Sequence, residues 1–195
     1  MATETRLLIV RHPETEANVT GRFVGQGESP FTAEGRRQAR RLPLKLSRFH
    51  PDVVWSSPLL RAAVVAERTS RLAQVPLRID ERLMELDFGA AHGLTWEEIA
   101  EAGIPFNYRA ADEPVAPGGE SRDALEARVG ACLEEICAQG GRHVVVAHAG
   151  VMRAALARLL GLSGDGLWLF HIHNAQMAQL HVFDGHAQLE EYVQG

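Results

Sequence analysis

Lysine is almost missing from this chain of 195 residues. Lys45 is one of 20 basic side chains, which leaves 19 arginines. The arginine fork is planar and permanently charged, and it suits phosphate and carboxylate groups. Acidic residues outnumber basic ones by 25 to 20, and the net charge of −5 argues against binding to nucleic acid or to an acidic membrane. We therefore expect neither among its partners.

Cysteine is also scarce. Cys132 and Cys137 are too few for a disulfide framework, and their spacing on a helix places them on different faces. No apolar run approaches the roughly 20 residues of a membrane span. The first residues lack the hydrophobic stretch of a signal peptide. These absences favour a soluble cytoplasmic protein, and the length suits a single domain over residues 1–195.

Short apolar runs alternate with helical patterns along the chain. The runs 7–10, 53–55 and 144–147 are typical of strands buried on both faces of a parallel sheet. The first helix should end near Leu42, because Pro43 interrupts or kinks a helix. Helical patterns cover residues 32–42, 57–73, a short segment from residue 95, 121–136 and 151–160.

The C-terminal part has a different pattern. Segments 176–183 and 186–193 flank Asp184 and Gly185, which is a hairpin signal. Residues 104–120 are rich in proline and glycine, and we interpret them as a loop or lid. The order of elements predicts an α/β fold, a three-layer α/β/α sandwich with a mostly parallel central sheet and an antiparallel edge.

Polar side chains gather where the predicted strands end. Arg11 and His12 follow the first strand, Arg61 comes shortly after the second, and His148 follows the late one. In open parallel sheets the ligand crevice lies outside these carboxyl ends. A lone histidine after a strand is usually structural, but several basic groups meeting at one edge repel each other. An anionic ligand would relieve that repulsion.

One segment among these resembles a known family. Residues 8–15 (LIVRHPET), together with Asn18, are similar to the signature of the histidine phosphatase superfamily, which includes cofactor-dependent phosphoglycerate mutases and α-ribazole phosphatases. The chain has six such blocks in the family's order, and six blocks in order identify the family far more specifically than one block would. Further matches follow in the family's order at residues 21–25 and 32–35, 56–62, 83–89, 117–121 and 146–150.

The resemblance implies a role for each residue in the strand-end group. His12 would attack phosphorus and form a phosphohistidine, because neutral imidazole is a good nucleophile near pH 7. Its other nitrogen should donate to a backbone carbonyl or a similar acceptor. Arg11, Arg61 and His148 would bind the phosphoryl oxygens. Glu85 would give a proton to the leaving oxygen and later take one from water.

The resemblance also implies a substrate pocket around these groups. Asn18 and the backbone N–H of Ala149 would add neutral donors to the phosphate. His92 and Trp96 are further candidates for contact with the leaving group. The segment that resembles the family's leaving-group wall consists of Arg22, Phe23, Val24 and Gly25.

Two positions depart from the family's pattern, since Pro13 and Ala149 stand where glycine is common. Proline removes a backbone donor from the phosphate pocket and pushes His12 toward an extended backbone. An alanine N–H can still donate. Neither change removes a catalytic side chain.

A metal site is the competing interpretation for two other histidines. His171 and His173 alternate on a predicted strand, so they would share a face and could bind a metal. No third ligand lies at a supporting spacing, which favours solvent-facing side chains that could border the pocket, with Asn174 beside them. The histidine mechanism needs no metal, and we expect no cofactor.

The sequence therefore predicts a phosphomonoesterase that hydrolyses a small phosphorylated metabolite. A phosphoglycerate mutase is the first alternative, but the family's mutases are generally longer, and only about 27 residues separate Gly89 from Pro117 here. A non-catalytic binding module is disfavoured by the intact site. α-Ribazole phosphate, sugar phosphates and phosphoglycerate all fit as substrates. Any self-association is expected to give a homodimer.

Overall fold

A six-stranded sheet forms the middle of the molecule, whose computed structural model describes residues 4–195. The strand order is β3-β2-β4-β1-β5-β6. The pairs β2–β3, β2–β4 and β1–β4 are parallel, whereas β5 pairs antiparallel with both β1 and β6. The predicted mostly parallel sheet with an antiparallel edge is confirmed. The strands are β1 (Thr5–Arg11), β2 (Val53–Ser56), β3 (Leu77–Ile79), β4 (Gly141–Ala147), β5 (Gln176–Phe183) and β6 (His186–Gln194).

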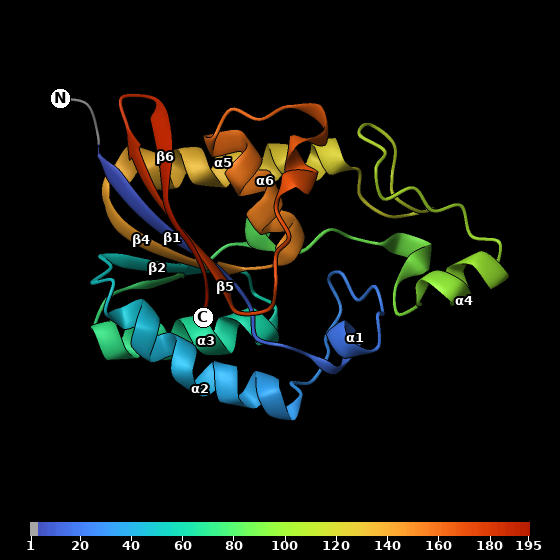
Figure 1. Cartoon of the computed structure of the whole chain (residues 1–195), viewed down its shortest axis with the longest axis horizontal. Helices are drawn as coiled ribbons and strands as arrows, with labels where there is room; N and C mark the ends of the chain where they lie inside the picture. The colour runs from blue at the N-terminus through green and yellow to red at the C-terminus, as the bar shows by residue number, and fades with distance from the viewer. Residues whose placement is uncertain (1–3) are drawn as a thin grey trace.

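Helices cover both faces of this sheet, with α2 and α3 on one side and α5 and α6 on the other (Figure 1). The small helix α4 lies away from the sheet, at the right of the same view. The α-helices are α1 (Glu16–Val19), α2 (Ala33–Ser47), α3 (Leu60–Ala73), α4 (Trp96–Glu101), α5 (Arg122–Gln139) and α6 (Ala149–Leu159). Short 3-10 helices lie at Glu81–Leu83, Gly89–Ala91 and Gly164–Leu169.

The central strands divide their side chains between two cores. In β1, Leu7 and Ile9 pack on the α5 and α6 side, whereas Leu8 and Val10 pack on the α2 and α3 side. This alternation follows from the two-residue period of a strand. All four side chains are buried, which accounts for the continuous apolar run that the sequence shows at residues 7–10.

Helix α2 shows where the prediction from proline was wrong. Pro43 lies inside the helix, which continues to Ser47. Proline cannot donate to the carbonyl four residues before it. That carbonyl belongs to Ala39 and instead accepts a long hydrogen bond of 3.5 Å from Arg68 on the neighbouring helix α3. A partner on α3 thus takes the place of the missing donor.

Three predicted helix starts are confirmed by side-chain caps: Thr32, Thr95 and Ser121 each accept a backbone N–H from the first turn. Ser57 is not such a cap. Helix α3 begins at Leu60, and the Ser57 hydroxyl contacts the functional site instead.

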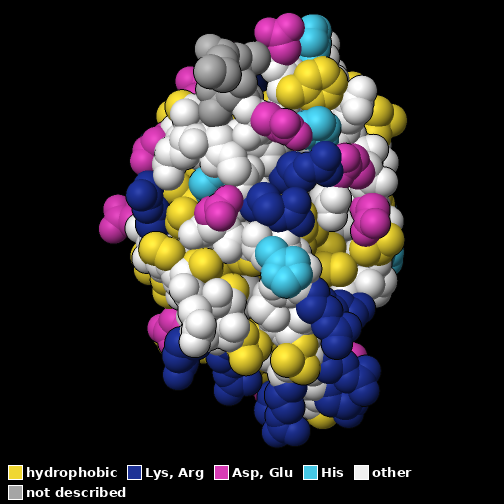
Figure 2. All heavy atoms as spheres, turned by 90° about the vertical axis from the view of Figure 1, so that its left-hand side faces the viewer, with side chains coloured by type: hydrophobic (Ala, Val, Ile, Leu, Met, Phe, Trp, Pro, Cys, Tyr) yellow, Lys and Arg dark blue, Asp and Glu magenta, His cyan; other side chains and the backbone are white. Residues whose placement is uncertain are grey.

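The arginine-rich composition is partly explained by one surface. Lys and Arg side chains gather at the lower end of the face shown in Figure 2, toward helix α2. This helix exposes Arg36, Arg37, Arg40, Arg41 and Lys45 to solvent. Among residues 4–195, no helix combines the length and the apolar character needed to cross a bilayer.

Candidate active site

The carboxyl ends of three adjacent strands bring the predicted residues together. The N–H of His12 donates to the Ala147 carbonyl at 2.9 Å, and the N–H of Ser57 donates to the Val146 carbonyl at 3.2 Å. These bonds continue the parallel ladders past the strand ends. They hold the segments after β1, β2 and β4 at one edge of the sheet, as the sequence predicted.

A cleft of about 550 Å³ opens at this edge. The residues that we predicted for the site line it, with the exceptions of His148 and the further candidate His92. His148 is fully buried beneath the cleft, and its ring centre lies 5.2 Å from that of His12.

The His12 ring is held in one tautomer by its neighbour. Its Nδ1 lies 2.7 Å from the Pro13 carbonyl oxygen, which can only accept, so Nδ1 carries the proton and Nε2 has a free lone pair. Burial, followed by the charges of Arg11 and Arg61, lowers the pKa of His12 well below its usual value. The acceptor that the sequence left unidentified is thus the carbonyl of Pro13.

Two arginines bring positive charge to His12, and backbone carbonyls orient both. Arg11 donates to the Ile172 carbonyl at 2.7 Å, and burial lowers its pKa to about 10, so it stays charged near neutral pH. Arg61 donates to the carbonyls of Gly25 and Gly27, each at 2.6 Å. Carbonyls fix both guanidinium groups without cancelling their charge, and Arg61 also has the half-exposed Glu28 carboxylate at 3.9 Å.

The two ring nitrogens of His148 differ in their hydrogen bonding. Its Nε2 lies 2.8 Å from the Ser57 hydroxyl, whereas its buried Nδ1 has no hydrogen-bond partner among the described residues. Burial is the main cause that lowers the pKa of His148 far below its usual value, and the neighbouring His12 and the charges of Arg61 and Arg11 add to it. The ring is therefore neutral and offers Nδ1 to a ligand.

The Glu85 carboxylate lies against the first turn of α6. It accepts the N–H of Gly150 at 3.1 and 3.2 Å and the N–H of Leu86 at 3.0 Å. A Cβ at position 150 would overlap a carboxylate oxygen of Glu85. The segment before it is fixed by Arg128, which donates to the carbonyls of Glu85 and Met84. No sequence motif indicated this role for Arg128.

Asn18 turns its amide oxygen away from the cleft. The oxygen accepts the Thr15 N–H and hydroxyl at 3.0 Å and the Asn174 amide at 2.8 Å. Because its oxygen is occupied, the NH₂ of Asn18 is the group left for a ligand in the cleft. Asn174 also donates to the His12 carbonyl at 3.3 Å.

The predicted leaving-group wall has a charged part and an aromatic part. Arg22 forms a two-pronged ion pair with Glu98, at 2.6 and 2.9 Å, and the hydrogen bond to Glu98 raises its pKa. Its charge is therefore already balanced. Phe23 packs against Phe88 and Trp96, with ring centres 5.0 and 5.2 Å away. Trp96 lines the cleft, whereas His92 does not.

The histidine pair near the C-terminus is placed differently from the prediction. His171 and His173 are both exposed, with ring centres 4.3 Å apart, but they precede β5 and belong to no strand. A turn at Ala175, whose φ is +60°, separates them from β5. His171 lines the cleft, and His173 does not. Among the side chains of residues 4–163 and 166–195, no three metal-ligating groups cluster.

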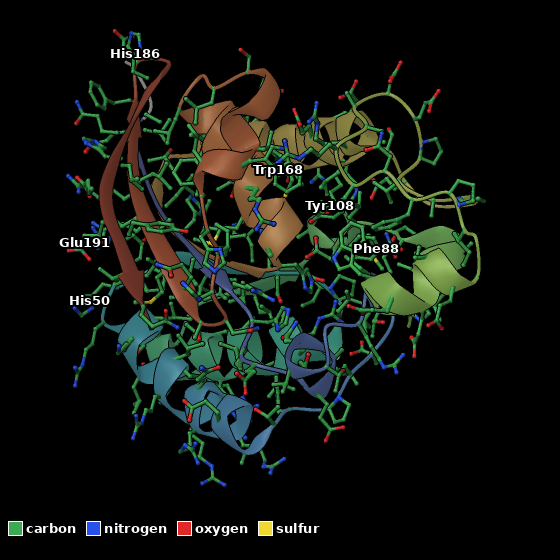
Figure 3. The ribbon with its side chains drawn as sticks, turned by 45° about the vertical axis from the view of Figure 1, so that its right-hand side comes forward. His50, Phe88, Tyr108, Trp168, His186 and Glu191 are labelled. Atoms are coloured by element: carbon green, nitrogen blue, oxygen red, sulfur yellow. The ribbon has the colours of Figure 1, made fainter. Side chains whose placement is uncertain are left out.

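Some cleft residues were missed at the sequence level, among them Tyr108 and Arg153. Tyr108 comes from the irregular loop 104–120, and Arg153 comes from α6. Figure 3 shows Phe88, Tyr108 and Trp168 in succession on the side of the molecule between α6 and α4. A signal for Arg153 existed, because it is four residues after Ala149 and so shares its helix face.

The chain belongs to the histidine phosphatase superfamily (branch 1), whose family model matches residues 7–194. It is 34% identical over 183 residues to phosphoserine phosphatase 1 of Hydrogenobacter thermophilus, covering 91% of this chain and 86% of that one. It is 32% identical over 177 residues to the adenosylcobalamin/alpha-ribazole phosphatase of Escherichia coli, covering 86% and 85%.

A solved structure has the same fold. Mycobacterial glucosyl-3-phosphoglycerate phosphatase, complexed with VO3, superposes with a TM-score of 0.86 at 30% identity, covering 97% of this chain and 99% of that one. The predicted family and fold are thus confirmed, and these relatives are phosphatases of small phosphorylated metabolites.

Proposed function

We propose that the chain is a phosphomonoesterase that hydrolyses a small phosphorylated metabolite through a phosphohistidine on Nε2 of His12. One observation carries the proposal: the Pro13 carbonyl binds Nδ1–H of a neutral, buried ring that lines the cleft. The nitrogen left over is then an unprotonated nucleophile without further activation.

The surrounding donors are suited to a phosphoryl group. Arg11 and Arg61 supply two positive charges, and Asn18 supplies a neutral N–H. When Ser57 donates its hydroxyl proton to Nε2 of His148, Nδ1 of that ring carries a proton for a phosphoryl oxygen. Such donors, fixed before substrate binds, stabilise the charge that develops in the transition state.

Glu85 would serve both halves of the reaction. In the first, Nε2 of His12 attacks phosphorus, the bond to the leaving oxygen breaks, and protonated Glu85 gives that oxygen its proton. In the second, Glu85 takes a proton from water as the water oxygen attacks phosphorus. The N–P bond then breaks, inorganic phosphate leaves, and His12 returns to its neutral form.

The test is removal of the nucleophile. His12→Ala should lose essentially all turnover of p-nitrophenyl phosphate while its circular dichroism spectrum is unchanged. Acid-labile, base-stable phosphate should appear on the quenched wild-type protein and be missing from the variant. His173→Ala removes an exposed histidine outside the cleft and is the matched control. Substantial turnover by His12→Ala would refute the proposal.

The mutase alternative is separated in the same experiment. Incubation with 3-phosphoglycerate should release inorganic phosphate rather than yield the 2-phosphoglycerate isomer. Net isomerisation that outpaces phosphate release would instead identify a mutase.

A further inference from the structure

Four arginines line the cleft, and their partners differ. Arg22 is neutralised by Glu98, whereas Arg11 and Arg61 belong to the proposed phosphoryl site. Arg153 is half-buried, and no acidic side chain in residues 4–163 or 166–195 forms a salt bridge with it. A partly buried guanidinium without an acidic partner is costly, so its positive charge points to an anionic ligand.

Arg153 lies on the same face of α6 as Ala149, the first residue of this helix. Ala149, four residues earlier, also lines the cleft, so Arg153 is about one helical turn, roughly 5.4 Å, farther along the axis. The phosphoryl site lies at the beginning of this helix. A ligand that contacts both the phosphoryl site and Arg153 must therefore be short.

The side chain of Arg153 is held in a way that leaves its outer donors available. Its Nε donates to the Phe170 carbonyl at 3.3 Å, and its guanidinium lies 5.4 Å from the Trp168 ring centre. These contacts fix the plane of the group. The charge of Arg153 also lies close to the Tyr108 phenol, and no carboxylate in residues 4–163 or 166–195 pairs with its two terminal amino groups, which are left for an anionic ligand.

Tyr108 brings a second donor to the same end of the cleft. Its ring centre lies 5.0 Å from that of Trp168 and 6.0 Å from that of Phe88, as the labelled side chains in Figure 3 illustrate. Burial raises the pKa of the Tyr108 phenol, so its hydroxyl keeps its proton at neutral pH. The hydroxyl can therefore donate to an anion.

We propose that Arg153 and Tyr108 form a subsite for the carboxylate of the substrate, which is then the phosphate ester of a short hydroxy acid or hydroxy amino acid. This inference rests on the proposed phosphatase function. The planar fork of one guanidinium matches the two oxygens of a carboxylate. A second phosphoryl group would need more positive charge, such as the two charges that Arg11 and Arg61 bring to the proposed phosphoryl site.

The test compares two esters that differ only in the carboxylate. O-phosphoserine should be hydrolysed with a higher kcat/KM than O-phosphoethanolamine. Arg153→Met keeps the length of the side chain and removes its charge. It should lower kcat/KM for O-phosphoserine about 10- to 100-fold, because a charge-assisted hydrogen-bonded pair is lost. Hydrolysis of O-phosphoethanolamine should change little.

Arg109 offers a matched control. Its guanidinium also lies over the Trp168 ring, at 5.7 Å, but it is exposed and does not line the cleft. Arg109→Met should therefore leave the preference for O-phosphoserine unchanged. Arg153→Lys keeps the charge without the fork and should recover part of the preference.

Hydrolysis of p-nitrophenyl phosphate separates the two proposals. If the wild type and Arg153→Met both hydrolyse this ester but neither prefers O-phosphoserine, the carboxylate subsite is refuted and the phosphatase stands. An equal loss of kcat/KM for O-phosphoserine and O-phosphoethanolamine in Arg153→Met would also refute the subsite. A wild type inactive on every ester would overturn both proposals.

Discussion

The backbone N–H of Gly150 donates to both carboxylate oxygens of Glu85, at 3.1 and 3.2 Å. Gly150 is in the first turn of α6, and His148 is the residue that precedes this helix. The start of one helix therefore fixes the proposed acid/base and a proposed phosphoryl ligand relative to each other.

Replacement of Gly150 should disturb this relationship. In Gly150→Ala the added Cβ overlaps a Glu85 oxygen, so the carboxylate must move from its place beside the cleft. Because small misplacements of a catalytic group are costly, we expect kcat/KM for an alkyl phosphate to fall about 10²-fold. Ala149→Gly, which adds no atom next door, is the control. An unchanged kcat/KM in Gly150→Ala would show that this contact does not set the position of the acid.

Glu85 itself is tested by the leaving group. An alkoxide leaves slowly without a proton, whereas p-nitrophenolate leaves readily. Glu85→Gln should therefore lose about 10²–10⁴ in kcat/KM for alkyl phosphates and much less for p-nitrophenyl phosphate. Single-turnover bursts isolate the first transfer from dephosphorylation, in which Glu85 also acts. Equal losses with both leaving groups would remove Glu85 from the acid role.

Buried histidines should make stability depend on pH. Burial lowers the pKa values of His12, His143 and His148 in the folded protein. The unfolded chain then binds more protons below pH 6.5, so the free energy of unfolding should fall as the pH is lowered from 7 to 5. Each histidine contributes a slope of up to about 1.4 kcal/mol per pH unit.

Urea titrations at several pH values measure that slope. His148→Gln should flatten it, and His186→Gln, at an exposed position, should not. An identical slope in wild type and His148→Gln would contradict the lowered pKa of His148.

Pro13 should matter for stability more than for chemistry. Pro13→Gly keeps the carbonyl that accepts Nδ1–H of His12, so the nucleophile retains its tautomer. The unfolded chain gains freedom, and we expect the free energy of unfolding to fall by about 0.4–1 kcal/mol. Thermal unfolding and kcat/KM test both statements. A large gain in rate would show instead that the missing N–H limits the natural protein.

The sheet could be predicted because apolar runs and helix caps are local signals. Leu7 to Val10 is buried on both faces, and no polar residue interrupts it. The prediction at Pro43 was wrong because the effect of this proline depends on a residue that is distant in the sequence. Arg68 on α3 supplies the hydrogen-bond donor that Pro43 lacks.

The candidate site shows the same limit. His12 and His148 could be placed together because both follow strands of one parallel sheet. Tyr108 could not, since loop 104–120 has no periodic pattern to position it. Arg153 is one of 19 arginines, and only its place on the cleft of the folded chain distinguishes it.

Loop 104–120 lies outside the sheet and carries none of the proposed phosphoryl ligands, yet it supplies Tyr108 to the cleft. Mutations around Tyr108, away from Glu120 and its ion pair with Arg128, can therefore change which alcohol is released while leaving the bond-breaking groups intact. A duplicated gene copy could acquire a new substrate preference by mutations in this segment, with every intermediate variant still active. Laboratory evolution confined to these residues has the same freedom.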